Sequence, residues 1–592
     1  MSWFAALPDN AAGRDMVARF PDSARRIAAH GSGLPWLIGS LPPEQCTIVE
    51  SGSARLAVLG YCPSTAVALA EQLVRIRGLA DLDALAGALR GSCHLVLSLD
   101  GNTRVQGTVS GLRRVFYARC AGRVVAADRA DVLAGATSAE PDELWLTAAV
   151  LGPDLPHPLA DRTAWRGIEA VPADSALHLD ARGQARLRRW WTPPEPTLSS
   201  ADGAQALRTE LRDAVAARTR RASAPVGCDL SGGMDSTALC FLASRGDPVA
   251  VTVHYRDIAN DDAHWADLAA TALPDLQRLI VESESVPRHF TGIAGEHPPT
   301  DAPSPLVRGR AVLGMSADLY ARRGVRTHLA GHGGDEVVGA PVGYLHELVR
   351  RSPRTALDHL RGHRARHRWT LPQIVRGLSD RRSYAQWLRD EADLLTAPEQ
   401  ASRLFGWGVP LRLPPWVTLH GTQSVAAMLR ACADHAAPLA STRGNHWALH
   451  RIQAAGRLYR LMLQEIQYPI THLPFLDDRV LEVCLAVRPA DRGTPWRYKP
   501  LLAEAMRGIV PDPMLNRTTK AGTDSDFYEG LRANRSEVID LVETAPLAGQ
   551  GLIDPIALRN AVLAPNHRWS PALEDTLICL GWRPRIPITT TP

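Results

Sequence analysis

The sequence SGGMDST, at residues 231–237, lies directly after an apolar run at residues 225–230 that suits a buried strand, and it opens a predicted helix. Two glycines let the backbone turn tightly and approach a ligand, and a helix N-terminus attracts anions. The hydroxyl groups of this stretch can donate hydrogen bonds to phosphate oxygens. The pattern predicts a pyrophosphate cradle, with a plain strand-to-helix turn as the alternative. The residues predicted to bind the nucleotide are Ser231, Gly232, Gly233, Asp235, Ser236 and Thr237.

A second glycine-rich acidic loop, GHGGDE at residues 331–336, follows a strand predicted over residues 327–330. Strands and helices alternate between the two loops, and this alternation predicts a doubly wound parallel sheet of four strands. Such sheets bind ligands beyond the carboxyl ends of their strands. Both loops are therefore expected to face one crevice.

Asp235 and Asp335, one from each loop, are the predicted ligands of Mg²⁺. This ion prefers a few carboxylates combined with phosphate and water oxygens, so the pair suits an ion that bridges the phosphates of ATP. Glu336 is a weaker candidate, and its alternative role is that of a helix cap.

Only two of the 66 basic residues are lysines, Lys499 and Lys520. A Walker A loop needs a Gly-Lys-Ser/Thr sequence and a protein kinase needs a lysine on its third strand, and neither lysine stands in such a context. ATP chemistry in this chain must therefore use another phosphate cradle.

Composition narrows the class of protein further. The formal charge is +4 over 592 residues, which does not indicate a nucleic-acid partner. No signal sequence and no long apolar run is present, so a cytoplasmic enzyme without a membrane partner is expected. The nine cysteines are scattered without metal-ligand or disulfide spacing, and are expected to be reduced, mostly buried thiols.

The chain is long enough for two domains. Short alternating apolar runs predict an antiparallel α+β domain over residues 1–192, and a Pro-, Ser- and Thr-rich stretch predicts a linker over residues 193–203. Residues 204–592 form the second predicted domain, with the parallel sheet followed by long helices such as one over residues 346–360.

Four blocks, taken in order, resemble the asparagine synthetase superfamily. Residues 231–236 are similar to its pyrophosphate-binding motif, and residues 331–336 to its second acidic loop. Residues 468–477 end in a Pro-Phe-Leu-Asp sequence that resembles another signature of the family. Lys499 and Lys520 fall where the family keeps two lysines, in a chain that otherwise uses arginine.

The resemblance implies an ATP-pyrophosphatase fold, like that of the adenine nucleotide α-hydrolases, in the second domain, and an Ntn-hydrolase-like fold in the first. It implies that Lys499 contacts an ATP phosphate and that Lys520 stabilises the charge that develops on the adenylate, the tetrahedral intermediate and pyrophosphate. It further places the adenine against the second strand of the sheet. The remaining residues implied to bind the nucleotide are Val251, Val253, Gly331 and Gly333.

The sequence departs from asparagine synthetases at the N-terminus. Ser2 stands where those enzymes expose a cysteine that hydrolyses glutamine, and their glutamine-binding sequences are missing. Residues 107–117 still resemble later strands of that domain. We therefore expect a degenerate glutaminase domain that retains the fold without the activity.

His332 occupies a position where asparagine synthetases carry glutamate and β-lactam synthetases carry tyrosine. An imidazole suits proton transfer near neutrality, so His332 is a candidate base for the incoming amine. The alternative is a loop residue that only hydrogen-bonds a neighbour.

An enzyme without an ammonia source must take its amine from the substrate, as β-lactam synthetases, carbapenam synthetases and lasso peptide cyclases do. The length of the chain and its helical C-terminal part favour a lasso peptide macrolactam synthetase, whose partners would be a precursor peptide and possible companions, a leader peptidase and a leader-recognition protein. A β-lactam-synthetase-like or ammonia-dependent enzyme acting on a small amino acid is the first alternative. A non-catalytic binding partner is the second.

Overall fold

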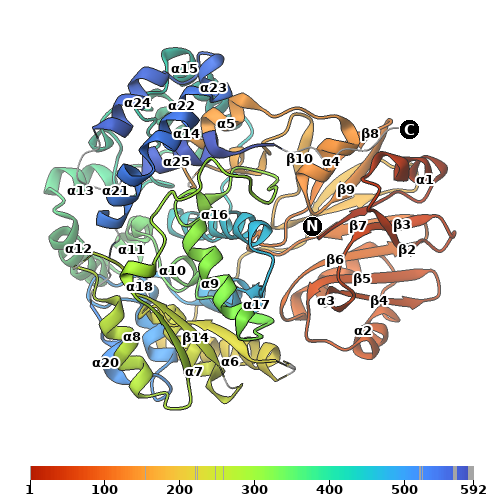
Figure 1. Ribbon diagram of the computed structural model, residues 1–592, viewed down its shortest axis with the longest axis horizontal. Helices are drawn as coiled ribbons and strands as arrows, with labels where there is room; N and C mark the ends of the chain where they lie inside the picture. The colour runs from red at the N-terminus through yellow and green to blue at the C-terminus, as the bar shows by residue number, and fades with distance from the viewer. Residues whose placement is uncertain are drawn as a thin grey trace.

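The computed structural model describes residues 2–153, 155–220, 222, 224–246, 248–257, 259–518, 522, 524–564 and 570–584. The described chain combines two six-stranded antiparallel sheets with one five-stranded parallel sheet, so the predicted mixed α/β class is confirmed. In Figure 1 the antiparallel sheets lie at the right, the parallel sheet lies at the lower left, and the C-terminal helices gather above it.

The antiparallel sheets occupy the N-terminal part of the chain. One sheet has the strand order β10-β8-β9-β1-β3-β2, and the other has the order β12-β11-β7-β6-β5-β4. Helices lie between the strands in the sequence. The elements are β1 (Trp3–Ala6), α1 (Ala11–Met16), β2 (Arg25–Ala29), β3 (Pro35–Ser40), β4 (Cys46–Ser51), β5 (Ala54–Tyr61), α2 (Ala66–Leu73), α3 (Leu82–Ala88), β6 (Ser92–Leu99), β7 (Asn102–Gln106), β8 (Phe116–Cys120), β9 (Arg123–Ala127), α4 (Ala130–Thr137), α5 (Glu143–Ala149), β10 (Ile168–Ala170), β11 (Ser175–Leu179) and β12 (Ala185–Arg189).

The parallel sheet has the strand order β15-β14-β13-β16-β17. The chain runs from the central strand β13 to β14 and β15 on one side, and then to β16 and β17 on the other, so the direction of winding changes between β13 and β16. This change of direction creates the crevice in which doubly wound sheets bind ligands. The elements are α6 (Ser200–Thr219), β13 (Val226–Asp229), α7 (Met234–Ala243), β14 (Val249–Val253), α8 (Asp262–Thr271), β15 (Gln277–Val281), α9 (Arg310–Arg322), β16 (Thr327–Leu329), α10 (Gly334–Val337) and β17 (Ile470–His472).

The fifth strand corrects the prediction of four. β17 has only three residues, too few to show the alternation of apolar and polar residues that indicates a strand, and all three are half-buried. It joins the sheet through its parallel pairing with β16, which is more than 140 residues earlier in the chain.

The remaining helices come after β16 in the sequence, on either side of β17. The helix predicted over residues 346–360 is wrong as a single element, because Pro353 starts a new helix and cannot donate the hydrogen bond that would continue the first. The elements are α11 (Leu345–Arg351), α12 (Pro353–His367), α13 (Leu371–Leu378), α14 (Tyr384–Asp393), α15 (Leu419–Ala433), α16 (Arg443–Glu465), α17 (Asp478–Ala486), α18 (Pro489–Arg492), α19 (Pro500–Ala505), α20 (Asp512–Leu515), α21 (Asp524–Ala533), α22 (Arg535–Glu543), α23 (Pro546–Gly549), α24 (Pro555–Leu563) and α25 (Pro571–Gly581).

The start of α6 also differs from the sequence-based expectation. The Ser199 hydroxyl accepts from the N–H of Asp202 and caps the helix, so the helix begins at Ser200, inside the stretch that was predicted to be linker. Leu207 and Leu211 are fully buried on the side of α6 that faces the core.

The two parts of the chain share a hydrophobic core. One cluster of buried side chains combines residues of β1, β9 and α5 with residues of α14, α15 and α25. The rings of Trp165 and Trp582 meet edge-on within it, with centroids 5.4 Å apart. The N-terminal sheets therefore pack directly against the C-terminal helices.

A buried ion pair joins the end of α6 to the Pro-Phe-Leu-Asp sequence. Arg218, at the end of α6, makes a bidentate contact of 2.7 and 2.8 Å with Asp477, the last residue of the Pro-Phe-Leu-Asp sequence. The guanidinium also lies 4.3 Å from the ring centroid of Tyr61 on β5. Three distant segments of the chain therefore meet at one cation.

Two general features accompany the fold. No helix in the described ranges is long and apolar enough to cross a membrane. All nine cysteines are free and seven of them are buried, which agrees with the expectation of reduced thiols.

Removing either partner of the Arg218–Asp477 pair should destabilise the protein strongly. The remaining charge would be buried without its partner, which costs about 3–5 kcal/mol. Arg218→Ala and Asp477→Ala should each lower the midpoint of urea unfolding followed by tryptophan fluorescence. The exposed pair Arg389–Asp434 (2.9 Å) is the control, and Asp434→Ala should change the unfolding free energy by under about 1 kcal/mol. Equal midpoints for the buried and exposed variants would contradict this account.

Candidate active site

The two acidic loops touch each other at the carboxyl edge of the parallel sheet. A Cβ atom on Gly331 would lie 2.7 Å from the backbone nitrogen of Ser236, and one on Gly334 would lie 2.4 Å from Cγ of Asp235. Real Cβ contacts are never this short, so only glycine permits the approach at either position. The glycines of the second loop thus allow it to pack against the carboxylate of the first.

The first loop turns sharply between β13 and α7. Gly232 has φ +82°, and a Cβ atom there would lie 2.1 Å from the carbonyl oxygen of Asp262. The loop brings the hydroxyls of Ser231 and Ser236 side by side, 2.9 Å apart. Thr237 is buried, and its N–H closes the first turn of α7 onto the carbonyl of Gly233. The loop therefore presents backbone N–H groups and two hydroxyls at a helix N-terminus.

Lys499 connects the two loops. Its ammonium contacts the carboxylate of Asp235 and lies 2.8 Å from Oδ1 of Asp335. Although burial opposes its charge, these two carboxylates raise the pKa of Lys499 above its ordinary value. Only 6% of the side chain is exposed, so the ammonium is held inside the crevice.

The backbone of Lys499 is itself unusual. It has φ +43° at the position that caps α19, a left-handed conformation that costs a non-glycine residue free energy. The neighbouring Tyr498 donates its hydroxyl to Oδ1 of Asp335 at 3.2 Å. The hydroxyl of Tyr498, which the sequence did not single out, helps to orient the second carboxylate.

The described residues fit a Mg²⁺ ion that arrives with ATP. The ammonium of Lys499 bridges Asp235 and Asp335, so oxygens of both carboxylates lie close enough to bind one metal ion together. Within the described ranges, no group of three or more His, Cys, Asp or Glu side chains could hold a metal alone. The remaining ligands would have to be phosphate and water oxygens, which is the coordination that Mg²⁺ prefers.

His332 lies in the second acidic loop, three residues after the end of β16. Its ring stacks on Tyr459 of α16 with centroids 4.7 Å apart and an interplanar angle of 22°. Burial lowers the pKa of His332 below its ordinary value, and His328 adds to this effect, whereas Asp229 and Asp335 oppose it. The imidazole is therefore neutral near pH 7, as a base for an amine must be.

Lys520 lies outside the described residues, but Arg517, three residues earlier, is described. Arg517 donates to the carbonyl of Gly232 at 2.8 Å and contacts Asp261 and Asp262 at 2.6 and 2.7 Å. The chain that leads to Lys520 is thus attached to the first acidic loop. Its contacts span more than 250 residues, so no local sequence signal could have identified Arg517.

Val251 and Val253 lie on β14, beside the central strand. The carbonyl of Val251 accepts from the N–H of Leu230, and its N–H lies 3.3 Å from the Tyr320 hydroxyl. Val253 is the last residue of β14 and extends past the end of β13. Of the two residues, Val253 is the one placed at the edge of the crevice.

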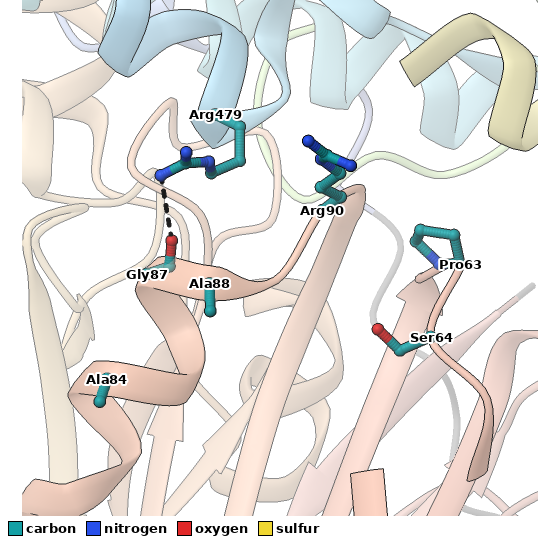
Figure 2. Close-up of a pocket in the computed structure, with 7 residues that line it drawn as sticks. All are labelled: Pro63, Ser64, Ala84, Gly87, Ala88, Arg90 and Arg479. Atoms are coloured by element: carbon teal, nitrogen blue, oxygen red, sulfur yellow. Dashed lines mark hydrogen bonds between the residues drawn. The ribbon is translucent and has the colours of Figure 1, made fainter. Parts of the chain in front are cut away.

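Several hollows lie at the junction of the N-terminal part with the rest of the chain, among them one beside Arg479 and one beside Ser2. Figure 2 shows the first, of about 720 Å³, where Arg479 of α17 donates to the carbonyl of Gly87 and Arg90 extends beside it. Both arginines are paired with carboxylates, including that of Glu210. None of its lining residues belongs to the acidic loops.

The second hollow, of about 350 Å³, is lined by Ser2 and by residues of both parts of the chain. Its polar groups serve the fold. Burial lowers the pKa of His94 to about 3, and its ring contacts the carbonyl of Arg114. Burial raises the pKa of Asp128 to about 7, and its carboxylate accepts from the N–H of Phe4. Among the described residues that line this hollow there is no cysteine.

Comparisons with known proteins agree with this arrangement at the level of the family. Two solved structures have a TM-score of 0.22 to this one, which is too low to carry an argument about the fold. A glutamine phosphoribosylpyrophosphate amidotransferase from B. subtilis, complexed with ADP and GMP, is 11% identical over 47% of this chain and 65% of its own, so this chain spans less than two thirds of it. A structure described as the allosteric regulatory enzyme of purine biosynthesis is 10% identical over 56% of this chain and 89% of its own.

No curated protein matches the sequence. The family model for asparagine synthase matches residues 206–582, which include both acidic loops, the Pro-Phe-Leu-Asp sequence and both lysines. The chain therefore belongs to the asparagine synthase family, a family of ATP-dependent, AMP-forming carbon–nitrogen ligases.

Proposed function

We propose that this chain activates a side-chain carboxylate, Asp or Glu, of a precursor peptide as its adenylate and closes a macrolactam with the N-terminal amine of the same peptide, as lasso peptide cyclases do. The observation that carries the proposal is the ammonium of Lys499, held between Asp235 and Asp335 where two strand-end loops meet. This arrangement suits the phosphates of ATP and a divalent cation. The family supplies the reaction class.

In this proposal each described side chain has one task. Asp235 and Asp335 would hold Mg²⁺, which neutralises phosphate charge and orients the triphosphate. Lys499 would then turn its ammonium to a phosphate oxygen, and Ser231, Ser236 and the N-terminus of α7 would bind the departing pyrophosphate. Lys520, on the segment that Arg517 attaches, would supply the second ammonium.

The source of the amine distinguishes this proposal from an asparagine synthetase. The hollow beside Ser2 has no cysteine among its described lining residues, and its buried His94 and Asp128 are engaged by backbone groups. These features support an Ntn-like N-terminal domain, over residues 1–192, that retains its fold without glutaminase activity. The amine would then come from the substrate, whose N-terminus and acyl adenylate must be held about 3–3.5 Å apart.

The size of the substrate is inferred from the length of the chain. The helices α11 to α15 and α21 to α25 add a large helical region to the parallel sheet, which gives room for a peptide. A leader peptidase and a leader-recognition protein are possible companions, and the cytoplasm is the proposed location. A small amino acid substrate, as in β-lactam synthetases, remains the alternative.

Mass spectrometry tests the proposal directly. The purified chain, with ATP, Mg²⁺ and any companion peptidase, should convert a candidate precursor peptide into a product lighter by one water. Pyrophosphate should appear in equal amount. Pyrophosphate release with free amino acids, and none with peptides, would favour the small-substrate alternative.

The two carboxylates and the two lysines should be indispensable for adenylation. Asp235→Ala, Asp335→Ala and Lys520→Ala should each lower pyrophosphate release by at least about 100-fold, because each removes a preorganised charge next to phosphate. Lys499→Arg should also fail, since a guanidinium fork cannot replace a compact buried ammonium. Ser2→Ala is the control and should leave the rate unchanged. Loss of activity in Ser2→Ala alone would instead reveal a working N-terminal site.

The pH dependence should report His332 as the base. The neutral imidazole predominates above its pKa, which burial lowers from the ordinary 6.5, so the cyclisation rate should stay constant down to about pH 6.5 and fall only below it. His332→Ala should remove this acid limb and reduce the rate about 100-fold, while adenylation continues. An unchanged pH profile in His332→Ala would exclude the imidazole as the base.

A further inference from the structure

Asp229 is a carboxylate at the carboxyl end of the central strand, and no sequence motif singled it out. It is the last residue of β13, the central strand, and lies two residues before the first acidic loop. The neighbouring strand, β16, leads directly into the loop that carries His332. Asp229 therefore stands where the winding of the sheet changes direction, which is where such sheets bind substrates.

Side chains of neighbouring elements fix one oxygen of this carboxylate. Oδ1 of Asp229 lies 3.0 Å from Nε2 of His328 on β16 and 3.3 Å from the hydroxyl of Tyr320 on α9. Nδ1 of His328 lies in turn 3.1 Å from the hydroxyl of Thr471 on β17. Two strands of the sheet, β16 and β17, and the helix α9 thus orient the carboxyl plane.

The other oxygen is open to a ligand. No residue that the structure describes makes a hydrogen bond to Oδ2 of Asp229, and no described lysine or arginine pairs with this carboxylate. About a third of the side chain, 32%, is exposed. Burial raises the pKa of Asp229, but His328 and His332 lower it by more. The net pKa lies below the ordinary value, so the group is an anion near neutral pH. An oriented anion whose second oxygen has no hydrogen-bond partner among the described residues is suited to bind a cation.

His332 connects this anion to the phosphate end of the site. It lies in the loop that follows β16, it interacts electrostatically with both Asp229 and Asp335, and its ring stacks on Tyr459. The candidate base is therefore within electrostatic range of both Asp229 and one of the nucleotide carboxylates. An amine that attacks an acyl adenylate must arrive from the end opposite the phosphates.

We propose that Asp229 binds the ammonium form of the attacking amine through Oδ2 and holds it beside the ring of His332. This inference rests on the proposed function, because it requires a substrate amine that attacks an acyl adenylate. It deepens that function by assigning the place where the N-terminus of the substrate binds, which the sequence left open.

The ammonium loses one proton to the ring of His332, and the freed nitrogen lone pair forms a bond to the acyl carbon. The tetrahedral adduct collapses, its carbon–oxygen bond to phosphate breaks, and AMP leaves with that electron pair. The nitrogen releases its second proton to solvent, and the amide remains. Asp229 stays ionised throughout.

The Asp229→Asn variant separates this role from a structural one. The amide oxygen can still accept from His328, so the fold is kept while the charge is lost. Adenylation can be followed by trapping with hydroxylamine, which is largely neutral at pH 7 and does not need an anion to bind it. The probes are a synthetic core peptide that wild-type enzyme cyclises and the same peptide acetylated at its N-terminus.

Three results are expected. Asp229→Asn should form peptide hydroxamate within about threefold of the wild-type rate but cyclise the free peptide about 100-fold more slowly. Acetylation should raise the KM for hydroxamate formation in wild-type enzyme, because the ammonium contact is lost. In Asp229→Asn acetylation should leave the KM unchanged.

Asp213→Asn is the matched control, because Asp213 is a part-exposed carboxylate on α6 that pairs with Arg90 outside the crevice. It should behave as wild type in every assay. Equal loss of hydroxamate and cyclic product in Asp229→Asn would show a structural role and overturn the assignment, as would an acetylation effect of wild-type size. Failure of wild-type enzyme to form hydroxamate with any peptide would instead contradict the proposed function.

Discussion

The ammonium of Lys499 joins Asp235 to Asp335, and the chemistry assigned to this protein depends on that junction. The two carboxylates come from loops about 100 residues apart, and like charges this close repel unless a cation lies between them. The lysine supplies that cation from a strained backbone position, at 6% exposure. The site is therefore prepared for a triphosphate with a divalent ion, because the geometry that one cation maintains can accept another.

Packing far from the crevice holds this junction in place. Leu501 and Leu502, directly after Lys499 on α19, belong to the same hydrophobic cluster as Leu207 and Leu211 of α6. Arg218 at the end of α6 binds Asp477, and the same guanidinium lies over Tyr61 of the N-terminal sheets. The Pro-Phe-Leu-Asp sequence that marks the family thus contributes a buried ion pair. The N-terminal part thus contacts the ligase part at this guanidinium.

Local sequence patterns were enough to predict the parallel sheet and both acidic loops. An apolar run, then glycines, then the start of a helix all lie within a few residues of one another. The resemblance to asparagine synthetases added the expected roles of Lys499 and Lys520. What the sequence could not reveal depends on distant pairing. β17 has three residues and is a strand only because β16 lies beside it, and Arg517 reaches Gly232 across the fold. In the sequence, Asp229 is part of a run predicted to be a buried strand. Its contact with His328 forms only because β16 pairs with β13.

The central claim is that the crevice makes an acyl adenylate, and an isotope measurement tests it most directly. A substrate peptide whose reacting carboxylate carries ¹⁸O on both oxygens should transfer one label to AMP when its oxygen attacks the α-phosphate, and the amide should keep the other. Mass analysis of the nucleotide products would show singly labelled AMP and unlabelled pyrophosphate. Unlabelled AMP, or ADP with labelled phosphate, would contradict the account, because either would mean that the carboxylate is activated in another way.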